Sequence, residues 1–194
     1  MNDAFARAYA AVTAMVADVP DLAAFGPWPA AAAPRDIAAN PVPAADLVHV
    51  LEPATSPVTH AAYEAIRGIA PLANWQHTYT EAEVGADFLA RYGWFELVGP
   101  FGHFHASDTR AYVAFWGRGL IYPWHVHEAE EMYFVLSGAA QFETEGEETE
   151  VLGPGGTRFH RSWQPHALTT RDDLLTLVLW RGAGLDGEAR MGTA

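Results

Sequence analysis

The chain is 194 residues long, half of it hydrophobic and 18% charged, which suits one well-filled core and excludes an intrinsically disordered protein. Its 24 acidic and 11 basic residues give a formal net charge of −13. No two basic residues are adjacent, which argues against a nucleic-acid ligand, because phosphate binding needs a concentrated basic face. Cysteine is absent, so disulfides are excluded and any metal site must use histidine and carboxylate ligands.

The N-terminal segment predicts one amphipathic helix. Residues 4–17 repeat apolar side chains at three- and four-residue spacing, and the helix should end before Pro20. Residues 26–45, rich in alanine and proline, should form an irregular surface connection. The segment lacks the basic start of a signal peptide, and no apolar run is long enough to span a bilayer. We therefore expect a cytoplasmic protein with no membrane partner.

Two further helices are expected before the strands begin. One should start at residues 55–57, because Ser56 can cap a helix and Pro57 suits its first position, and should run towards Gly68. The other should cover residues 81–92 and be stopped by Gly93.

The chain after Gly93 predicts an antiparallel β-sandwich or small barrel. Short runs rich in aromatic and β-branched residues are broken by glycine, proline or aspartate. The runs are residues 94–98, 111–116, 131–136, 139–144, 148–152, 166–169 and 174–180. We therefore expect a mainly β protein (α+β) with a helical N-terminal region, 1–92, packed on a barrel, 93–181. A flexible, glycine-rich tail should occupy residues 182–194.

Residues 119–138, GLIYPWHVHEAEEMYFVLSG, carry the polar side chains that point to chemistry. Alternate residues of a strand share a face, so His125 and His127 can point into the barrel together, as can Glu131 and Tyr133 on the next strand. In that register Val135 also points inward. The residues expected to pack outward are Met132, Phe134 and Leu136. An isolated His-x-His is more often a hydrogen-bonded surface pair, but two imidazoles and a carboxylate also suit a divalent metal.

The spacing of this segment resembles the first signature motif of the cupin superfamily from Gly119 to Gly138. Residues 154–167, PGGTRFHRSWQPHA, resemble the second motif more loosely. The resemblance implies a cupin jelly-roll barrel and makes His166 the last metal ligand, with His160 as the alternative. Gly156 replaces a common aspartate, and residues 161–163 replace the usual Pro-x-Gly turn, which is why both histidines stay open.

A narrower resemblance is to the cupin-fold dimethylsulfoniopropionate lyases, bacterial-type enzymes with a helical part before a barrel of this size. It is carried by His125, His127, Glu131 and Tyr133, and by Tyr122 just upstream of the first histidine, and is specific over residues 91–181. It implies a metal-dependent carbon–sulfur lyase that forms dimethyl sulfide and acrylate by β-elimination. The substrate would be a small zwitterionic sulfonium carboxylate.

The resemblance also implies roles for the site residues. Tyr133 would be the base, with Tyr122 as its neighbour, although position alone equally suits a core tyrosine whose hydroxyl is satisfied. The metal would be zinc, iron, manganese, cobalt or nickel, since all accept mixed imidazole and carboxylate ligands. A sulfonium favours aromatic faces. The candidates for substrate binding are Trp116, Trp124, Trp163, Trp180 and His160, and about two tryptophans should touch ligand.

Two other functions suit the same residues. A cupin oxygenase or isomerase would hold its metal with the same ligands and keep Tyr133 away from the reacting atoms, and a non-catalytic cupin would bind a small carboxylate. A homodimer is compatible with the fold through either the exposed sheet face or the helices.

Overall fold

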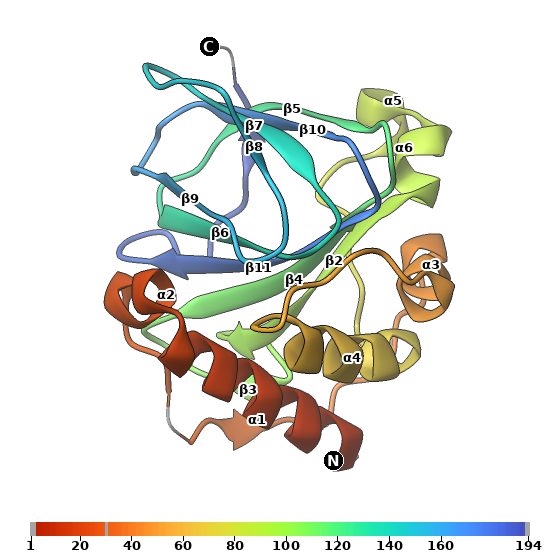
Figure 1. Cartoon of the computed structure of the whole chain (residues 1–194), viewed down its shortest axis with the longest axis vertical. Coiled ribbons are helices and arrows are strands. Elements are labelled where there is room, and N and C mark those ends of the chain that lie inside the picture. Colours follow the sequence, from red (N-terminus) through yellow and green to blue (C-terminus); the bar gives the residue numbers. More distant parts are fainter. Residues whose placement is uncertain (1–2, 30, 193–194) are drawn as a thin grey trace.

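The structure is a computed structural model that describes residues 3–29 and 31–192 (Figure 1). Its helices are α1 (Asp3–Asp18), α2 (Pro20–Phe25), α3 (Pro43–Val50), α4 (His60–Ile69), η1 (Ala70–Leu72), α5 (Glu81–Val84) and α6 (Ala86–Ala90). Its strands are β1 (Ala33–Pro34), β2 (Tyr92–Gly99), β3 (Phe104–His105), β4 (Arg110–Trp116), β5 (Ile121–Val126), β6 (Glu130–Ser137), β7 (Ala140–Thr144), β8 (Glu150–Leu152), β9 (Thr157–His160), β10 (His166–Thr170), β11 (Leu174–Arg181) and β12 (Arg190–Met191).

The predicted first helix is confirmed by α1, and the connection after it is more structured than expected. Pro20 ends α1 and also begins α2, since proline is tolerated in a first helical turn, where its missing N–H has no partner to lose. Residues 26–45 were expected to be irregular throughout. They contain β1 and the start of α3, whose first residue is Pro43.

The second predicted helix starts later than its sequence signals indicate. The backbone N–H of Ser56 donates to Thr59 Oγ1 at 2.9 Å, and residues 57–59 form a turn. The His60 N–H then donates to the Ser56 carbonyl at 2.9 Å, and α4 begins at His60. Ser56 therefore lies in the approach to the helix and does not cap it as predicted, because the Ser56–Thr59 pairing forms the turn first.

The third predicted helix is two short helices separated by Gly85. This glycine has φ of +82°, a left-handed conformation that interrupts helical hydrogen bonding. The stop at Gly93 is wrong, because α6 ends at Ala90 and Gly93 lies inside β2. A Cβ at Gly93 would lie 3.1 Å from Val42 and 3.2 Å from Trp75, so close packing is the reason for a glycine here.

The strands form two antiparallel-dominated sheets with jelly-roll connectivity. The larger sheet has the order β1-β3-β2-β4-β11-β6-β9 and the smaller one β12-β5-β10-β7-β8. Of the eight strands from β4 to β11, four lie in each sheet, and the chain changes sheet at every step except from β7 to β8, which form a hairpin, as in a double-sheet cupin barrel. Each predicted run overlaps an observed strand, whereas β1, β3, β5, β9 and β12 were not among those runs. The fold class predicted from the sequence is confirmed.

The two faces of the larger sheet carry different cores. Phe115, Phe134 and Leu177 point outward and pack with buried residues of α1 to α4. Trp116, Tyr133 and Val178, their chain neighbours, point into the barrel. Figure 1 shows the N-terminal helices along one side of this sheet and the smaller sheet on the other. The alternation expected along residues 131–136 is therefore confirmed.

The segment after β11 is held against the barrel. Arg190 and Met191 of β12 pair with Val126 and His125 of β5, although the glycines of this tail predicted flexibility. The Arg110 guanidinium also donates to the Leu185 and Gly187 carbonyls at 2.9 and 2.8 Å. Among the described residues, no helix has the length and apolar character needed to cross a membrane.

Candidate functional site

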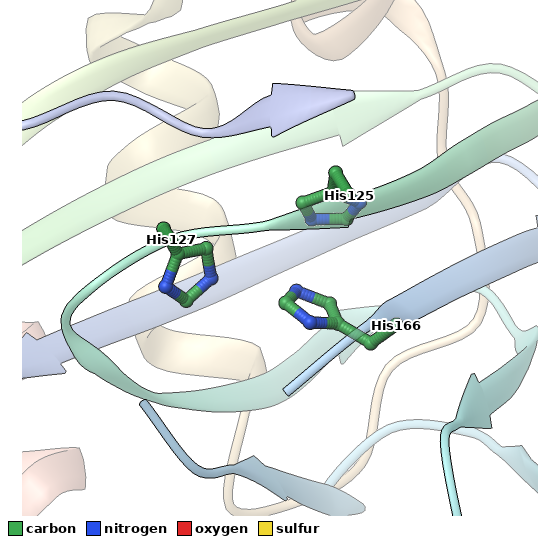
Figure 2. A group of neighbouring side chains, drawn as sticks. All are labelled: His125, His127 and His166. Atoms are coloured by element: carbon green, nitrogen blue, oxygen red, sulfur yellow. The ribbon is translucent and has the colours of Figure 1, made fainter. Parts of the chain in front are cut away.

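Three histidines converge inside the barrel from two neighbouring strands. His125 lies on β5 and His127 directly after it, while His166 opens β10 and is the register partner of His125. Each side chain is at most 2% exposed. Figure 2 shows the three imidazole rings pointing toward one another. The ring centroids of His125 and His166 lie 4.0 Å apart, and those of His127 and His166 5.0 Å apart.

The three rings share one hydrogen-bonding pattern. The Nδ1 atoms of His125, His127 and His166 lie 2.8, 2.9 and 2.8 Å from the carbonyl oxygens of Pro123, Ala129 and Gln164, each two residues away in the chain. Since a carbonyl can only accept, Nδ1 is the donor in all three rings, and Nε2 is the ring nitrogen left as a possible metal ligand. Metal-ligating histidines commonly use this arrangement to fix ring orientation.

Glu131 of β6 completes the group from the opposite sheet. Its Oε2 lies 3.0 Å from His166 Nε2 and 3.4 Å from His127 Nε2, and its side chain is only 3% exposed. Its Oε1 accepts a hydrogen bond from the Trp180 indole N–H at 2.8 Å. One carboxylate oxygen therefore faces the imidazoles while the other is held by the barrel wall.

The electrostatics of the group favour an ionised carboxyl at Glu131. Burial opposes ionisation of Glu131, but the charges of His127 and His166 outweigh it, so the pKa of this carboxyl lies well below its ordinary value. Burial, together with His166, holds the pKa of His125 well below its ordinary value. Burial also opposes protonation of His127, yet Glu131 outweighs it and raises the pKa of that imidazole.

The residues present fit a divalent metal ion. Ligand atoms of His125, His127 and His166 lie within 4.8 Å of one another, as do those of Glu131, His160 and His166. The Nε2 atoms of His127 and His166 are buried and have no hydrogen-bond partner among the described residues, a costly state that a cation would relieve. Neutral imidazoles and one carboxylate are ligands that zinc and its neighbours accept.

His160, the alternative last ligand, lies beside this group in a different role. It is the register partner of Glu131 on β9, and its Nδ1 lies 3.0 Å from Glu131 Oε2 rather than from a carbonyl. Its ring stacks on His166 with centroids 3.8 Å apart. Burial, followed by His166, lowers the pKa of His160 to about 4. Its hydrogen bond therefore differs from the pattern that the other three rings share.

Tyr133 and Tyr122 line the cavity that opens onto these groups. The Tyr122 ring lies 4.4 Å from the His125 ring, and its hydroxyl lies 3.4 Å from that of Tyr92, which is 2.7 Å from Thr78 Oγ1. Among the described residues the Tyr133 hydroxyl has no hydrogen bond. Burial raises the pKa of both phenols well above 10, with Glu131 as the next cause at Tyr133 and Tyr92 at Tyr122.

The four candidate tryptophans divide into two pairs. Trp116 and Trp180 line the cavity, and both are nearly fully buried. Trp124 on β5 and Trp163 on the loop before β10 are not among the lining residues. Trp163 is 49% exposed and has φ of +59°, an uncommon conformation for a residue with a side chain. His160 is likewise absent from the cavity lining.

The cavity has further aromatic walls that the sequence analysis did not select. Tyr92 and Trp94 enter from β2 and Tyr112 from β4, each at a position that alternates with a residue of the outer core. Tyr112 lies four residues before Trp116 on the same strand, so alternation from Trp116 would have identified it. His77 also lines the cavity.

Comparisons with known proteins agree on one family. Residues 30–177 match the model of the dimethylsulfoniopropionate lyase family. The chain is 38% identical over 186 residues to the dimethylsulfoniopropionate lyase DddQ of Ruegeria pomeroyi, covering 93% of this chain and 90% of that one. The crystal structure of DddQ from that organism superposes with a TM-score of 0.93 at 36% identity, over 98% of this chain and 97% of the other. A chain from crystal structures of the lyases RdDddP and RnDddQII superposes with a TM-score of 0.96 at 43% identity, over 98% of each chain.

Proposed function

The chain belongs to the dimethylsulfoniopropionate lyase family, and from that premise we propose that it cleaves dimethylsulfoniopropionate to dimethyl sulfide and acrylate with a divalent metal and Tyr133. The observation that carries this mechanism is that three buried imidazoles and one buried carboxylate meet beside a cavity lined by Tyr133, whose hydroxyl has no hydrogen bond among the described residues. The enzyme is a carbon–sulfur lyase, as its family implies.

The ligand set follows from the hydrogen bonds already described. His125, His127 and His166 have their Nδ1 protons committed to backbone carbonyls, so their Nε2 atoms would hold the ion together with Glu131 Oε2. When bound, a divalent ion supplies positive charge that offsets the substrate carboxylate and stabilises the negative charge that develops as the α-proton leaves. Zinc, iron, manganese, cobalt and nickel all suit such ligands.

Tyr133 is the residue best placed to take the proton. Its side chain follows Glu131 by two positions on β6, so both point into the cavity, and no protein group occupies its hydroxyl among the described residues. Burial and Glu131 keep the phenol protonated in the free protein, and a nearby cation acts in the opposite direction by favouring the phenolate.

The reaction is balanced by one proton transfer and one bond cleavage. The Tyr133 phenolate takes the α-proton, the C–H electron pair forms the carbon–carbon double bond of acrylate, and the C–S bond breaks with its electron pair on sulfur. Dimethyl sulfide therefore leaves as a neutral molecule and acrylate as an anion. Tyr122, whose hydroxyl approaches that of Tyr92, lies beside His125 and would position the substrate.

The sulfonium end would lie against the aromatic side of the cavity. Tyr92, Trp116 and Tyr122 have ring centroids 5.4 to 5.7 Å from one another and form a continuous apolar wall. A cation over such rings gains about 0.5 to 2 kcal/mol per aromatic face when water is excluded. One part of the cavity would therefore bind the substrate carboxylate through the metal, and the aromatic wall would bind the sulfonium.

Release of dimethyl sulfide under anaerobic conditions tests this proposal. Purified protein of measured metal content is incubated with dimethylsulfoniopropionate, and the headspace is analysed by gas chromatography while acrylate is quantified in solution. We expect equal amounts of the two products without oxygen, which also separates the lyase from a cupin oxygenase. Ligand-dependent stabilisation without either product, after loading with each of several divalent metals, would instead indicate a binding protein.

A further inference from the structure

Four inward-facing residues form one row across the larger sheet. The strand register pairs Arg110 of β4 with Trp180 of β11, Trp180 with Glu131 of β6, and Glu131 with His160 of β9. Directly opposed residues of neighbouring strands have side chains within contact distance. Each member is buried to within 5% exposure. The carboxylate of Glu131, the proposed metal ligand, therefore lies within a row of neighbouring side chains. The order of that row is fixed by the register of the strands.

Contacts along the row hold both oxygens of Glu131. The Trp180 indole N–H donates to Oε1 at 2.8 Å, and His160 Nδ1 lies 3.0 Å from Oε2. A buried indole N–H needs an acceptor, and a buried carboxylate needs donors, so each side chain satisfies the other. With Oε1 committed to Trp180, the carboxyl group cannot rotate freely, and Oε2 is the oxygen presented to the imidazoles.

Protein groups already lie against the Trp180 indole. Its ring lies 4.4 Å from the His127 imidazole at 31°, and Tyr112 meets it edge-on at 5.2 Å. The Arg110 guanidinium lies 5.6 Å from its centroid and is itself fixed by Glu96 at 2.7 Å. A sulfonium at this ring would have to share it with a guanidinium cation, which weakens the case for Trp180 as a substrate-binding face.

We propose that Trp180 is a positioning residue for the metal centre, which orients the Glu131 carboxylate through its indole N–H and braces the His127 ring with its face. The proposal rests on the metal site of the proposed function, because it assigns Glu131 as a ligand. It does not depend on the identity of the substrate. Partners of metal ligands commonly contribute about 10- to 100-fold to metal affinity or activity.

Metal affinity in the absence of substrate tests this role. Chelator-stripped wild-type protein and Trp180→Phe are titrated with Zn²⁺ in competition with a chromogenic chelator, and Co²⁺ spectra report the coordination. We expect Trp180→Phe to bind Zn²⁺ about 10- to 100-fold more weakly and to shift the Co²⁺ absorption bands. Unchanged Zn²⁺ affinity with a raised KM would overturn the proposal and return Trp180 to substrate binding.

Trp116→Phe is the matched control. Trp116 is as buried as Trp180 and lines the same cavity, but its indole N–H has no partner among the described residues. We expect its removal to leave Zn²⁺ affinity within about twofold of wild type, since no hydrogen bond to a ligand is lost. An equal loss of affinity in both variants would overturn the proposal, because it would reflect ring size alone.

A second variant keeps the test decisive if Trp180→Phe does not fold. Benzothienylalanine at position 180 retains the shape of the indole and replaces only its N–H by sulfur, so packing on His127 and Tyr112 is kept. Weaker Zn²⁺ binding in this folded variant supports the proposal, and wild-type affinity overturns it. Failure to release dimethyl sulfide in wild-type protein that still binds Zn²⁺ would count against the proposed function alone.

Discussion

Residues that alternate along β6 face two different environments. The outward residues contribute to stability, and the inward residues belong to the candidate site. Phe134 and Leu136 point outward into a core that is shared with the N-terminal helices and is mainly apolar. Glu131 and Tyr133 point inward, where a carboxylate, imidazoles and phenols are buried together. Burying polar groups costs free energy unless they are paired. The apolar outer face therefore supplies the stability that lets the inner face hold unpaired Nε2 atoms in a fixed arrangement.

The largest expected effect is from removing a ligand on the inner side. His127→Ala deletes an imidazole whose Nε2 is buried and faces Glu131 at 3.4 Å. We expect loss of bound metal and no measurable turnover, because the carboxylate of the substrate then has no cation to bind. Metal analysis after gel filtration and the headspace assay measure both. A variant that keeps stoichiometric metal would remove His127 from the ligand set.

Removing the inner phenol should separate turnover from metal binding. Tyr133→Phe deletes only the hydroxyl, which has no hydrogen bond among the described residues. We expect turnover to fall by about 10²- to 10⁴-fold, as for loss of a general base, with metal content and melting temperature unchanged. Steady-state kinetics, metal analysis and thermal unfolding check the three quantities.

Tyr63→Phe is the matched control from the outer core. The Tyr63 hydroxyl donates to the Leu51 carbonyl at 2.8 Å, on the side of the sheet away from the cavity. Its removal should cost about 1 kcal/mol of folding free energy and leave turnover unchanged. Undiminished activity in Tyr133→Phe would assign the base to another residue.

Truncating a large residue of the outer core should lower stability and leave metal binding unchanged. Phe134→Ala removes a ring that is 0% exposed and packed between the sheet and the helices. We expect the free energy of unfolding to fall by about 3 to 5 kcal/mol, measured by urea denaturation, while the remaining folded protein keeps its Zn²⁺ affinity. Phe101, which is 59% exposed, is the comparison, and Phe101→Ala should change stability by no more than about 0.5 kcal/mol.

The smallest effect is a pH dependence from the outer side. His103 Nε2 accepts a hydrogen bond from the Asn74 N–H at 3.2 Å, and burial lowers the pKa of His103 from 6.5 to about 4. A folded-state pKa below the unfolded one means that the unfolded chain binds the proton first. The contribution of His103 is therefore complete above pH 6.5 and is lost as the pH falls towards 4.

The free energy of unfolding of metal-free protein, measured at several pH values, tests this contribution of His103. One such group contributes at most about 1.4 kcal/mol per pH unit, so His103→Gln should flatten the decline in stability between pH 6.5 and 4 by up to that slope. His105→Gln, which replaces an exposed histidine two residues away, is the control. An unchanged slope in His103→Gln would show that protonation of this ring does not destabilise the fold.

Much of the candidate site could be predicted because its residues are close in the chain. His125, His127, Glu131 and Tyr133 lie within nine positions, and two-residue alternation is enough to place their side chains on one face. Spacing favoured His166 over His160 as the last ligand but left His160 open. The further support for His166 is the ring nitrogen that meets a backbone carbonyl, which is a property of folded backbone geometry.

The tryptophans show where prediction from the chain alone ends. Their residue type indicates aromatic faces for a sulfonium, but Trp163 is exposed on a loop while Trp180 is tied to Glu131 across a strand pair. The sheet register that brings β11 against β6 joins positions 49 residues apart, and no local pattern encodes that distance.

By itself, the sequence determined the strand-rich class of the C-terminal part, the candidate ligand types and the face on which each candidate lies, because periodicity and side-chain chemistry are local properties. Only the tertiary structure decided which groups meet: that Trp180 and His160 hold the two oxygens of Glu131, and that the segment after β11 pairs with β5 beside His125. These contacts depend on strand order and register. Strand order and register are set by the packing of the whole core and not by any one segment.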